Sequence, residues 1–273
     1  MKSPFVDEKP TPINALQLFS GEWACRLPPE IPDFPGAGSV RAFEDDRITW
    51  ANEKLSGLKR GFNGSKVLEL GPLEAAHTYM ISRLGAQEII AVENNARAYL
   101  KCLVVKEVLD IQRAHFLLGD ALAYIRSNAQ RFDIGIASAF LNHLLNPVEI
   151  IDCFAHFCDS IFLWNVVYHP SLFEKQPELR PSFGPPLAAN WNGYKHTLYP
   201  HHYGNVTDYA KFWGGSQGSA CWMEAEEIVH AARYFGFTQI EYKIDDHQFG
   251  KVLSLVAAKA ENSRIGVSSK ESV

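Results

Sequence analysis

SKVLELGPLEAAHTYMISRLGAQEIIAVE, residues 65–93, is the stretch that decides the fold class. A short apolar run from Val67 to Leu70 stops at a glycine–proline pair, and the helix-compatible segment after it ends at Gly85. A second apolar run then closes on Glu93. This order of strand, glycine turn, helix and strand predicts a βαβ unit, whose parallel strands are usually buried on both faces.

The ends of the two predicted strands carry carboxylates, Glu69 and Glu93. Ligands of parallel sheets bind beyond the carboxyl ends of the strands, and an acid at the end of the second strand can accept hydrogen bonds from ribose hydroxyls. The turn contains only Gly71 in place of the G-x-G-x-x-G spacing of a pyrophosphate site, and Glu74 would repel a phosphate. The turn therefore suits a nucleoside that bears a zwitterionic amino acid, and S-adenosylmethionine is such a molecule.

Four motifs in order extend this interpretation along the chain. They are the glycine-poor turn after Val67–Leu70, Glu93, the run HFLLGDAL with Asp120, and Phe132-Asp133 followed by FLNHLLNP with His143 and Pro147. From about residue 67 to 167, and more loosely to 259, the chain resembles the class I S-adenosylmethionine-dependent methyltransferases. The resemblance implies a Rossmann-like fold, Glu93 at the ribose, and Asp120 with Ala121 at the adenine. Asn94, the neighbour of Glu93, is also expected to contact the cofactor.

Two residues of the first motif are expected near the amino-acid part of the cofactor. Gly71 would let the backbone approach the ligand closely, because glycine has no side chain. Glu69 is expected either to face the cofactor ammonium or to pair with Arg97 or Lys66, and the sequence leaves these alternatives open.

Four further residues complete the expected cofactor site. His77 and Thr78 follow the turn and are candidates to donate hydrogen bonds to the cofactor carboxylate. Ser138 and Phe140 follow the fourth predicted strand, where cofactor and acceptor meet in the family that the chain resembles, and Phe140 is expected to form a wall.

A general base is needed only if the acceptor must lose a proton as it attacks, and His143, His201 and His202 are the candidates. A lone histidine in an apolar run, such as His143, is more often a packing residue. Other histidines and an acid gather in the same part of the chain, and the set is His169, His196, His201, His202 and Asp208. Nothing in their spacing fixes the convergence that metal ligands require, so we predict no metal and a substrate pocket lined by aromatic and imidazole rings.

Composition and charge limit the class of partner. The 273 residues are 47% hydrophobic and 21% charged, with a formal net charge of −5 and no basic block. This balance disfavours nucleic acid as a partner and favours a small-molecule acceptor. The sequence shows no apolar signal region at its start, no run of membrane-spanning length, and five cysteines without paired metal spacing. We therefore expect a cytoplasmic protein with free thiols and no membrane association; the oligomeric state stays open.

The chain divides into three expected parts. Residues 1–60, rich in proline, form an N-terminal arm that either packs its aromatic side chains on the core or covers the cofactor cleft. Residues 61–260 form the methyltransferase-like domain, with a lid insertion at about 169–222, where the sequence shows little periodicity. Residues 261–273 are expected to be a flexible tail.

The hydrophobic pattern predicts the elements of this domain. Asp45 or Asp46 caps a helix through Leu55, and helices and strands alternate from residue 67 to 167. After the lid come a helix at 223–235 and a hairpin with Asp245 and Asp246 in its turn. The result is an α/β, Rossmann-like sheet of seven strands, mostly parallel and with the last strand antiparallel, with helices on both faces.

Methyl transfer from S-adenosylmethionine to a small molecule is the function that the sequence supports best. One alternative is a tRNA wobble-uridine carboxymethyltransferase, because residues 75–95 and 132–143 are similar to parts of that family, although the acidic charge counts against it. A non-catalytic, regulatory protein that binds S-adenosylmethionine is the other alternative, because the turn lacks further glycines. A dinucleotide oxidoreductase ranks fourth.

Overall fold

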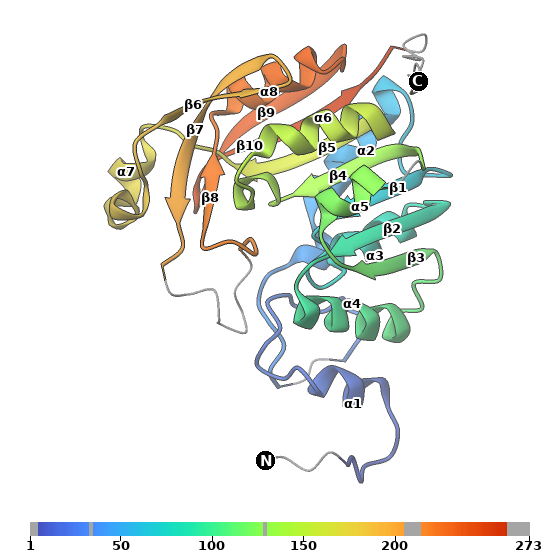
Figure 1. Ribbon diagram of the computed structural model, residues 1–273. Coiled ribbons are helices and arrows are strands. Elements are labelled where there is room, and N and C mark those ends of the chain that lie inside the picture. Colours follow the sequence, from blue (N-terminus) through green and yellow to red (C-terminus); the bar gives the residue numbers. More distant parts are fainter. Residues whose placement is uncertain (1–4, 33–34, 128–129, 205–213, 261–273) are drawn as a thin grey trace, which may run out of the picture.

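The computed structural model describes residues 5–32, 35–127, 130–204 and 214–260 (Figure 1). The predicted tail at 261–273 and the candidate ligand Asp208 lie outside the described residues.

A seven-stranded sheet forms the centre of the described structure, in the strand order β3-β2-β1-β4-β5-β10-β9. Strands β1 to β5 are parallel, and β10 runs antiparallel to both of its neighbours. The prediction of a seven-stranded, mostly parallel sheet with an antiparallel last strand is confirmed. The strands are β1 Lys66–Leu70, β2 Glu88–Glu93, β3 Ala114–Leu118, β4 Phe132–Ser138, β5 Cys158–Val166, β9 Gln239–His247 and β10 Gly250–Ala258.

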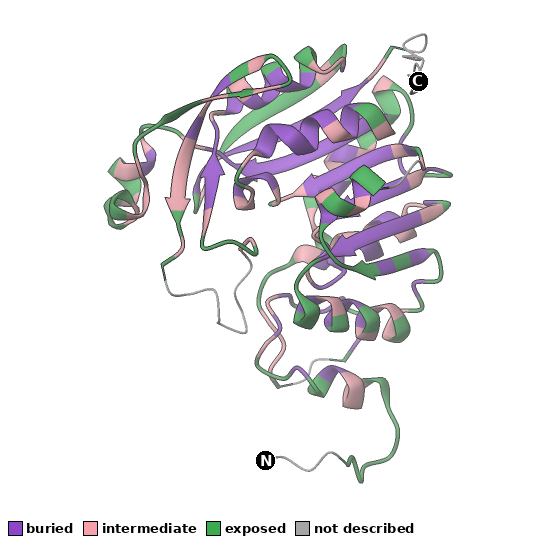
Figure 2. Cartoon of the chain, in the orientation of Figure 1, coloured by how far each residue is buried: buried purple, intermediate pink, exposed green. Residues whose placement is uncertain are grey.

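Helices cover both faces of this sheet. One face carries α2 Asp46–Leu58, α3 Ala76–Arg83 and α4 Ala96–Val108, and the other carries α5 Ala121–Ser127, α6 Pro147–Phe157 and α8 Ala225–Tyr234. Side chains along β5 alternate between the two cores: Phe162 and Trp164 pack on the α2 side, and Leu163 packs on the α6 side. Burial on both faces explains the continuous apolar runs of the central strands, which are buried in Figure 2.

Local capping explains where several helices begin. The Asp45 side chain accepts a hydrogen bond from the Arg47 N–H at the start of α2, as the sequence predicts. Asn95 caps α4 in the same way through the Arg97 and Ala98 N–H groups, and Pro147 occupies the first turn of α6.

The N-terminal arm lies outside the seven-stranded sheet. It contains α1 Pro12–Gln17, the short 3₁₀ helix η1 Ala42–Glu44 and, last, α2. Helix α1 contacts α4, and the buried Trp23 donates its indole N–H to the Leu16 carbonyl at 3.0 Å. The aromatic side chains of Phe19, Trp23 and Phe43 are therefore buried, whereas Phe5 is exposed.

Residues 169–222 contain a second sheet that the sequence analysis did not predict. It has three antiparallel strands, β6 Leu187–Trp191, β7 Tyr194–His202 and β8 Ser219–Trp222, and is preceded by α7 Leu172–Lys175 and the 3₁₀ helix η3 Pro177–Ser182. Strands β6 and β7 are mostly half-buried or exposed, so they lack a clear apolar alternation. The pair Asn192-Gly193, with φ of +46° and +88°, forms the β6–β7 turn, and an Asn-Gly pair is a hairpin signal that the analysis missed.

The prediction that Asp245 and Asp246 form the turn of the C-terminal hairpin was wrong. Asp245 and Asp246 lie inside β9, opposite Val252 and Lys251, and the turn falls at Gln248 and Phe249. Asp246 is accommodated at the sheet edge because the ammonium groups of Lys175 and Lys251 lie 2.6 and 3.0 Å from its carboxylate.

Within the described ranges, none of the helices has the length and apolar character needed to cross a bilayer.

Candidate active site

Two adjoining cavities open at the carboxyl edge of the parallel strands. A narrow cavity of about 180 Å³ lies beside the ends of β1, β2, β3 and β4, and a large cavity of about 730 Å³ lies between that edge, the arm and the lid. The residues that line both cavities are Gly71, Leu73, Ser138, Ala139, His143 and Gly214. The shared wall makes this junction the place where two ligands could meet.

The narrow cavity gathers most of the predicted cofactor residues. Its lining includes Gly71, Glu93, Asn94, Asp120, Ala121, Ser138 and Phe140. They come from four strand ends that are distant in sequence, and parallel topology places those ends at one edge. Asp120 also accepts a hydrogen bond from the Ala123 N–H at 2.8 Å, so it caps α5 as well as lining the cavity.

Glu93 is held rigidly at the end of β2. Its two carboxylate oxygens accept hydrogen bonds from the backbone N–H groups of Leu73, at 3.0 Å, and Asn95, at 2.9 Å. Burial raises the pKa of this carboxyl, and the backbone N–H groups oppose that effect. Each oxygen keeps lone-pair capacity for a further donor, such as a ribose hydroxyl.

The turn after β1 approaches its neighbours closely at Gly71. Its φ is +70°, and a Cβ there would lie 2.9 Å from the Phe140 ring, so glycine is required. Leu73 and Ala75 also adopt left-handed backbone conformations, with φ of +54° and +61°, although they are not glycines. Such conformations are unfavourable for L-residues, so the surrounding structure must stabilise this turn.

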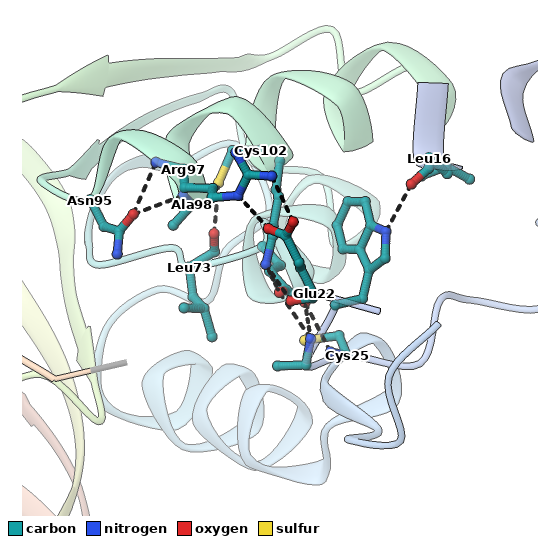
Figure 3. Close-up of polar contacts among 12 residues, drawn as sticks. Leu16, Glu22, Cys25, Leu73, Asn95, Arg97, Ala98 and Cys102 are labelled. Atoms are coloured by element: carbon teal, nitrogen blue, oxygen red, sulfur yellow. Dashed lines mark hydrogen bonds and ion pairs between the residues drawn. The ribbon is translucent and has the colours of Figure 1, made fainter. Parts of the chain in front are cut away.

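The arm supplies that stabilisation through Glu74. The buried Glu74 carboxylate accepts hydrogen bonds from the N–H groups of Ala24 and Cys25, at 3.0 and 2.9 Å, and from the Lys101 ammonium, at 2.8 Å. Figure 3 shows this part of the molecule, where the arm near Glu22 and Cys25 meets the turn at Leu73 and helix α4. Glu74 thus joins the arm, the turn and α4.

Glu69 and Thr78 lie behind the cavities rather than on their walls. Glu69 is buried and accepts a hydrogen bond from the Thr78 hydroxyl at 2.6 Å, and neither residue lines either cavity. Burial raises the pKa of Glu69. Neither basic residue proposed as its partner takes that role, because Arg97 pairs with Glu22 and Lys66 pairs with Glu88.

His77 lies on the wall of the large cavity, with its Nε2 2.9 Å from the Asp45 carboxylate. His77, which was expected near the cofactor carboxylate, therefore connects α3 to Asp45, the residue that caps α2.

Four parts of the chain, besides the ends of β1 and β4, build the walls of the large cavity, and one of them is the β9–β10 turn with His247, Gln248 and Phe249. The arm contributes Ala24, Cys25, Val40, Ala42 and Arg47; β5 contributes Trp164 and Val166; and the lid region contributes Leu179, His201, Tyr203 and Trp222. The arm therefore packs on the core and also covers the large cavity. Arg47, Trp164 and Trp222 were not predicted as site residues, because no local motif marks side chains that only the tertiary fold brings together.

His143 lies on the wall between the two cavities, in the 3₁₀ helix η2 Leu141–His143 after β4. Its Nδ1 lies 2.7 Å from the Tyr203 hydroxyl oxygen, and burial lowers the pKa of the imidazole to about 4. Gly215 passes so close that a Cβ there would lie 2.2 Å from the His143 carbonyl oxygen. The lid region and η2 are therefore in direct contact around a neutral imidazole.

The other two candidate bases lie in different environments. His201 lines the large cavity, and burial lowers its pKa to about 4. His202 is exposed at the end of β7 and lines neither cavity. In the described part of the chain, no three histidine, cysteine or acidic side chains converge as metal ligands would.

Comparison with known proteins identifies the fold. No family model and no curated protein sequence matches the chain. The solved N-terminal domain of EvdMO1 with bound SAH (S-adenosylhomocysteine) matches with a TM-score of 0.65 and 17% identity, over 91% of this chain and 95% of that one. The same domain in the presence of SAH and D-fucose matches with a TM-score of 0.64, 17% identity and the same coverage.

A second match is magnesium protoporphyrin IX methyltransferase (ChlM) from Synechocystis PCC 6803 with bound SAH. Its TM-score is 0.55 at 12% identity, over 81% of this chain and 85% of that one. A putative S-adenosylmethionine-dependent methyltransferase from Listeria monocytogenes matches with a TM-score of 0.51 and 12% identity, over 80% of this chain and all of that one. The chain therefore has the fold of the class I S-adenosylmethionine-dependent methyltransferases.

Proposed function

We propose that this protein transfers a methyl group from S-adenosylmethionine to a small-molecule acceptor held in the large cavity. The observation that carries the proposal is the pair of adjoining cavities. The narrow one gathers Gly71, Glu93 and Asp120, and it meets the large one at Ser138 and His143. A cofactor in the first and an acceptor in the second would have their reactive atoms at the shared wall.

The residues of the narrow cavity fit the cofactor. Glu93 is fixed by two backbone N–H groups and would accept hydrogen bonds from the ribose hydroxyls, and Asp120 would bind the adenine amino group. Gly71 would allow the backbone to pass close to the amino-acid part. When bound, S-adenosylmethionine supplies a methyl group on a positively charged sulfonium, which is already an activated leaving group.

The protein must then align the acceptor with that methyl group and exclude water. The arm and the lid region enclose the large cavity on the sides that the sheet leaves open. His143 is neutral near pH 7 because burial lowers its pKa to about 4. The two ring nitrogens of His143 lie 2.7 Å from the Tyr203 hydroxyl and 3.3 Å from the Asn142 amide nitrogen. A nitrogen released from its partner would accept the proton that a hydroxyl loses as its oxygen bonds to the methyl carbon and the carbon–sulfur bond breaks.

The fold matches support a small molecule as the acceptor. The EvdMO1 domain was solved in the presence of D-fucose, and ChlM is named for a porphyrin substrate. The formal net charge of −5 also disfavours a nucleic acid. Sugars are therefore the first acceptors to test.

The test is methyl transfer from tritiated S-adenosylmethionine to a panel of sugars, glycosides, other small hydroxyl compounds and bulk tRNA. We expect label in a small molecule, with a rate that falls by ~10²–10⁴-fold in His143→Gln if that residue is the base. Glu88→Gln, at the opposite end of β2, is the control. Transfer to tRNA alone would favour the wobble-uridine alternative, and cofactor binding without transfer to any acceptor would favour a non-catalytic protein.

A further inference from the structure

We propose that the acceptor is an uncharged ring compound that carries hydroxyl groups on more than one side, bound between the sheet edge and the lid region. This inference rests on the proposed function and adds the chemical class of the acceptor. It follows from the charges, the aromatic surfaces and the unused hydrogen-bonding groups of the large cavity.

The formal charges on the wall of the large cavity are already compensated within the protein. Among the described residues that line this cavity, two carry an arginine, lysine or acidic side chain, and they are Arg47 and Glu74. Arg47 makes two hydrogen bonds to Asp45, at 2.8 and 2.7 Å, and Glu74 pairs with Lys101. A charged acceptor would find no free counter-charge on these described walls and would pay the cost of leaving water.

Three of the four histidines that line the large cavity have a lowered pKa and so do not supply a free charge near neutral pH. The pKa of His143 and that of His201 are lowered to about 4 by burial. The pKa of His247 is lowered by burial and by the nearby Arg47. His77 Nε2 lies 2.9 Å from the Asp45 carboxylate, so this ring nitrogen already has a partner within the protein. The bound sulfonium at the junction would itself repel a cationic acceptor.

Aromatic side chains form two sides of the cavity. On one side the Arg47 guanidinium lies 4.0 Å over the Trp164 ring, and His247 packs edge-on against the same ring at 5.6 Å. On the other side Trp222 packs against Phe183 and His201, with ring centroids 5.1 and 5.3 Å apart. Surfaces of this kind bind rings with an apolar face.

Unused hydrogen-bonding atoms distinguish a hydroxyl from other groups. Four cavity-lining residues carry a buried side-chain atom without a partner among the described residues: Ser138 Oγ, Asn142 Oδ1, His201 Nδ1 and Trp222 Nε1. An indole N–H can only donate and an amide oxygen can only accept. A hydroxyl group serves both, whereas a carboxylate only accepts and an ammonium only donates.

The residues that carry these four atoms come from two sides of the cavity. Ser138 ends β4 and Asn142 lies in η2, whereas His201 lies in β7 and Trp222 in β8. The sheet edge and the lid region thus each contribute two atoms. A pyranose ring has hydroxyls around its edge and an apolar face, and a polyhydroxylated aromatic ring shares this chemistry.

The test measures binding to the full chain saturated with SAH by ligand-observed NMR titration. The probes are alkyl and aryl pyranosides, each with its matching uronic acid and amino sugar, and polyhydroxylated aromatic rings with their carboxylate and amine counterparts. We expect neutral members to bind at least about tenfold more tightly than their charged partners. The neutral set that binds more tightly, pyranosides or polyhydroxylated aromatic rings, shows which kind of ring the acceptor contains. Equal or tighter binding of the charged members, or no binding of any probe, would overturn the inference.

Three variants make the test specific. Trp222→Phe keeps an aromatic ring but removes the indole N–H, and should weaken binding of the neutral probes by about fivefold or more, the effect of about 1 kcal/mol from one hydrogen bond. Trp50→Phe is the control, because Trp50 packs on Phe162 and lines neither cavity. Unchanged binding in Trp222→Phe would contradict the assignment of the lid region as a polar wall.

Asp45→Asn tests the charge argument directly. Asparagine caps a helix as well as aspartate does, so α2 should be retained while Arg47 loses its counter-charge. We expect the uronic acids to bind more tightly in this variant while the neutral probes change little. If the ratio of uronic-acid affinity to neutral-probe affinity does not change, pairing of Arg47 with Asp45 is not what excludes anions from the cavity. Calorimetry with SAH on the same proteins separates the two proposals: failure of SAH binding contradicts the proposed function, and failure of the neutral preference alone contradicts this inference.

Discussion

Glu93 lies where β2 ends, and both of its carboxylate oxygens already accept a backbone N–H, one from Leu73 and one from Asn95. These bonds fix the carboxylate on the wall of the narrow cavity before any ligand arrives. A carboxylate that is already fixed in place loses little conformational entropy when it accepts hydrogen bonds from a ribose.

Glu93→Ala should therefore weaken SAH binding strongly. The loss of hydrogen bonds to a charged group costs on the order of 2–3 kcal/mol, or about 30- to 150-fold in affinity. Isothermal titration calorimetry measures the change, and circular dichroism confirms that the variant is folded. Glu88→Ala, at the other end of the same strand, is the matched control. A folded Glu93→Ala protein that binds SAH like the parent would refute the ribose assignment.

His143 gives the protein a predicted dependence of stability on pH. Burial lowers its pKa from the ordinary 6.5 to about 4, so the folded state binds this proton less tightly than the unfolded chain does. The corresponding stabilisation is fully present above pH 6.5 and is lost as the pH falls from 6.5 towards 4. A fall of the pKa from 6.5 to about 4 corresponds to about 3 kcal/mol of stability.

Urea unfolding of the parent and of His143→Gln at pH 7 and pH 4 measures this contribution. The parent should lose about 3 kcal/mol more than the variant between the two pH values. His230→Gln, an exposed position on α8, should behave like the parent. Equal losses in the parent and in His143→Gln would show that the imidazole is not held neutral by burial.

The turn between β1 and α3 depends on an element far away in sequence. Leu73 and Ala75 hold left-handed conformations without the freedom of glycine, and Glu74 between them is bound by the arm and by Lys101 on α4. The arm therefore replaces, by hydrogen bonds, the conformational freedom that a glycine-rich motif would provide. We call these hydrogen bonds of Glu74 to the arm and to Lys101 the Glu74 anchor, and we expect its loss to lower both the stability of the fold and the affinity for the cofactor.

Lys101→Met should destabilise the fold by roughly 3–5 kcal/mol, because it leaves the Glu74 carboxylate buried without its counter-charge. Arg97→Met is the control on the same helix: its ion pair with Glu22 is half-exposed and should contribute no more than about 1 kcal/mol. Denaturant unfolding gives both values, and SAH titration should show weaker binding only in Lys101→Met. Similar small effects in the two variants would argue against the anchor.

Elements with a local signal were predictable from the sequence, and elements without one were not. The β1–α3–β2 unit has buried strands and a glycine turn, so its apolar runs are continuous and its boundaries are marked. In β6 and β7, few side chains are fully buried, so the pattern that marks a strand is absent and only Asn192-Gly193 signals a turn.

The same contrast applies to the candidate site. Residues that follow parallel strands, such as Glu93 and Asp120, could be placed together because topology brings those ends to one edge. Glu69 was harder to place, because the residue before a strand end can point to either face, and it points to Thr78. Trp164 and Trp222 meet only through the tertiary fold, which no sequence spacing reveals.

At the scale of the whole molecule, the arm and the lid region enclose a cavity that the sheet alone would leave open. The arm supplies one wall from residues 24–47, and the sheet edge supplies a second. The lid region supplies a third from residue 176 onwards, and the β9–β10 turn supplies a fourth at residues 247–249. Figure 1 shows the small sheet of β6, β7 and β8 beside the carboxyl edge of the main sheet. This enclosure would exclude water from the proposed methyl transfer, and it depends on segments that are far apart in the sequence.

Calorimetric titration of the full chain with SAH and, separately, with NAD shows whether the narrow cavity binds S-adenosylmethionine. The single glycine of the turn and the buried Glu93 predict a micromolar-range dissociation constant for SAH and no comparable binding of NAD. Tight binding of NAD without binding of SAH would contradict the account.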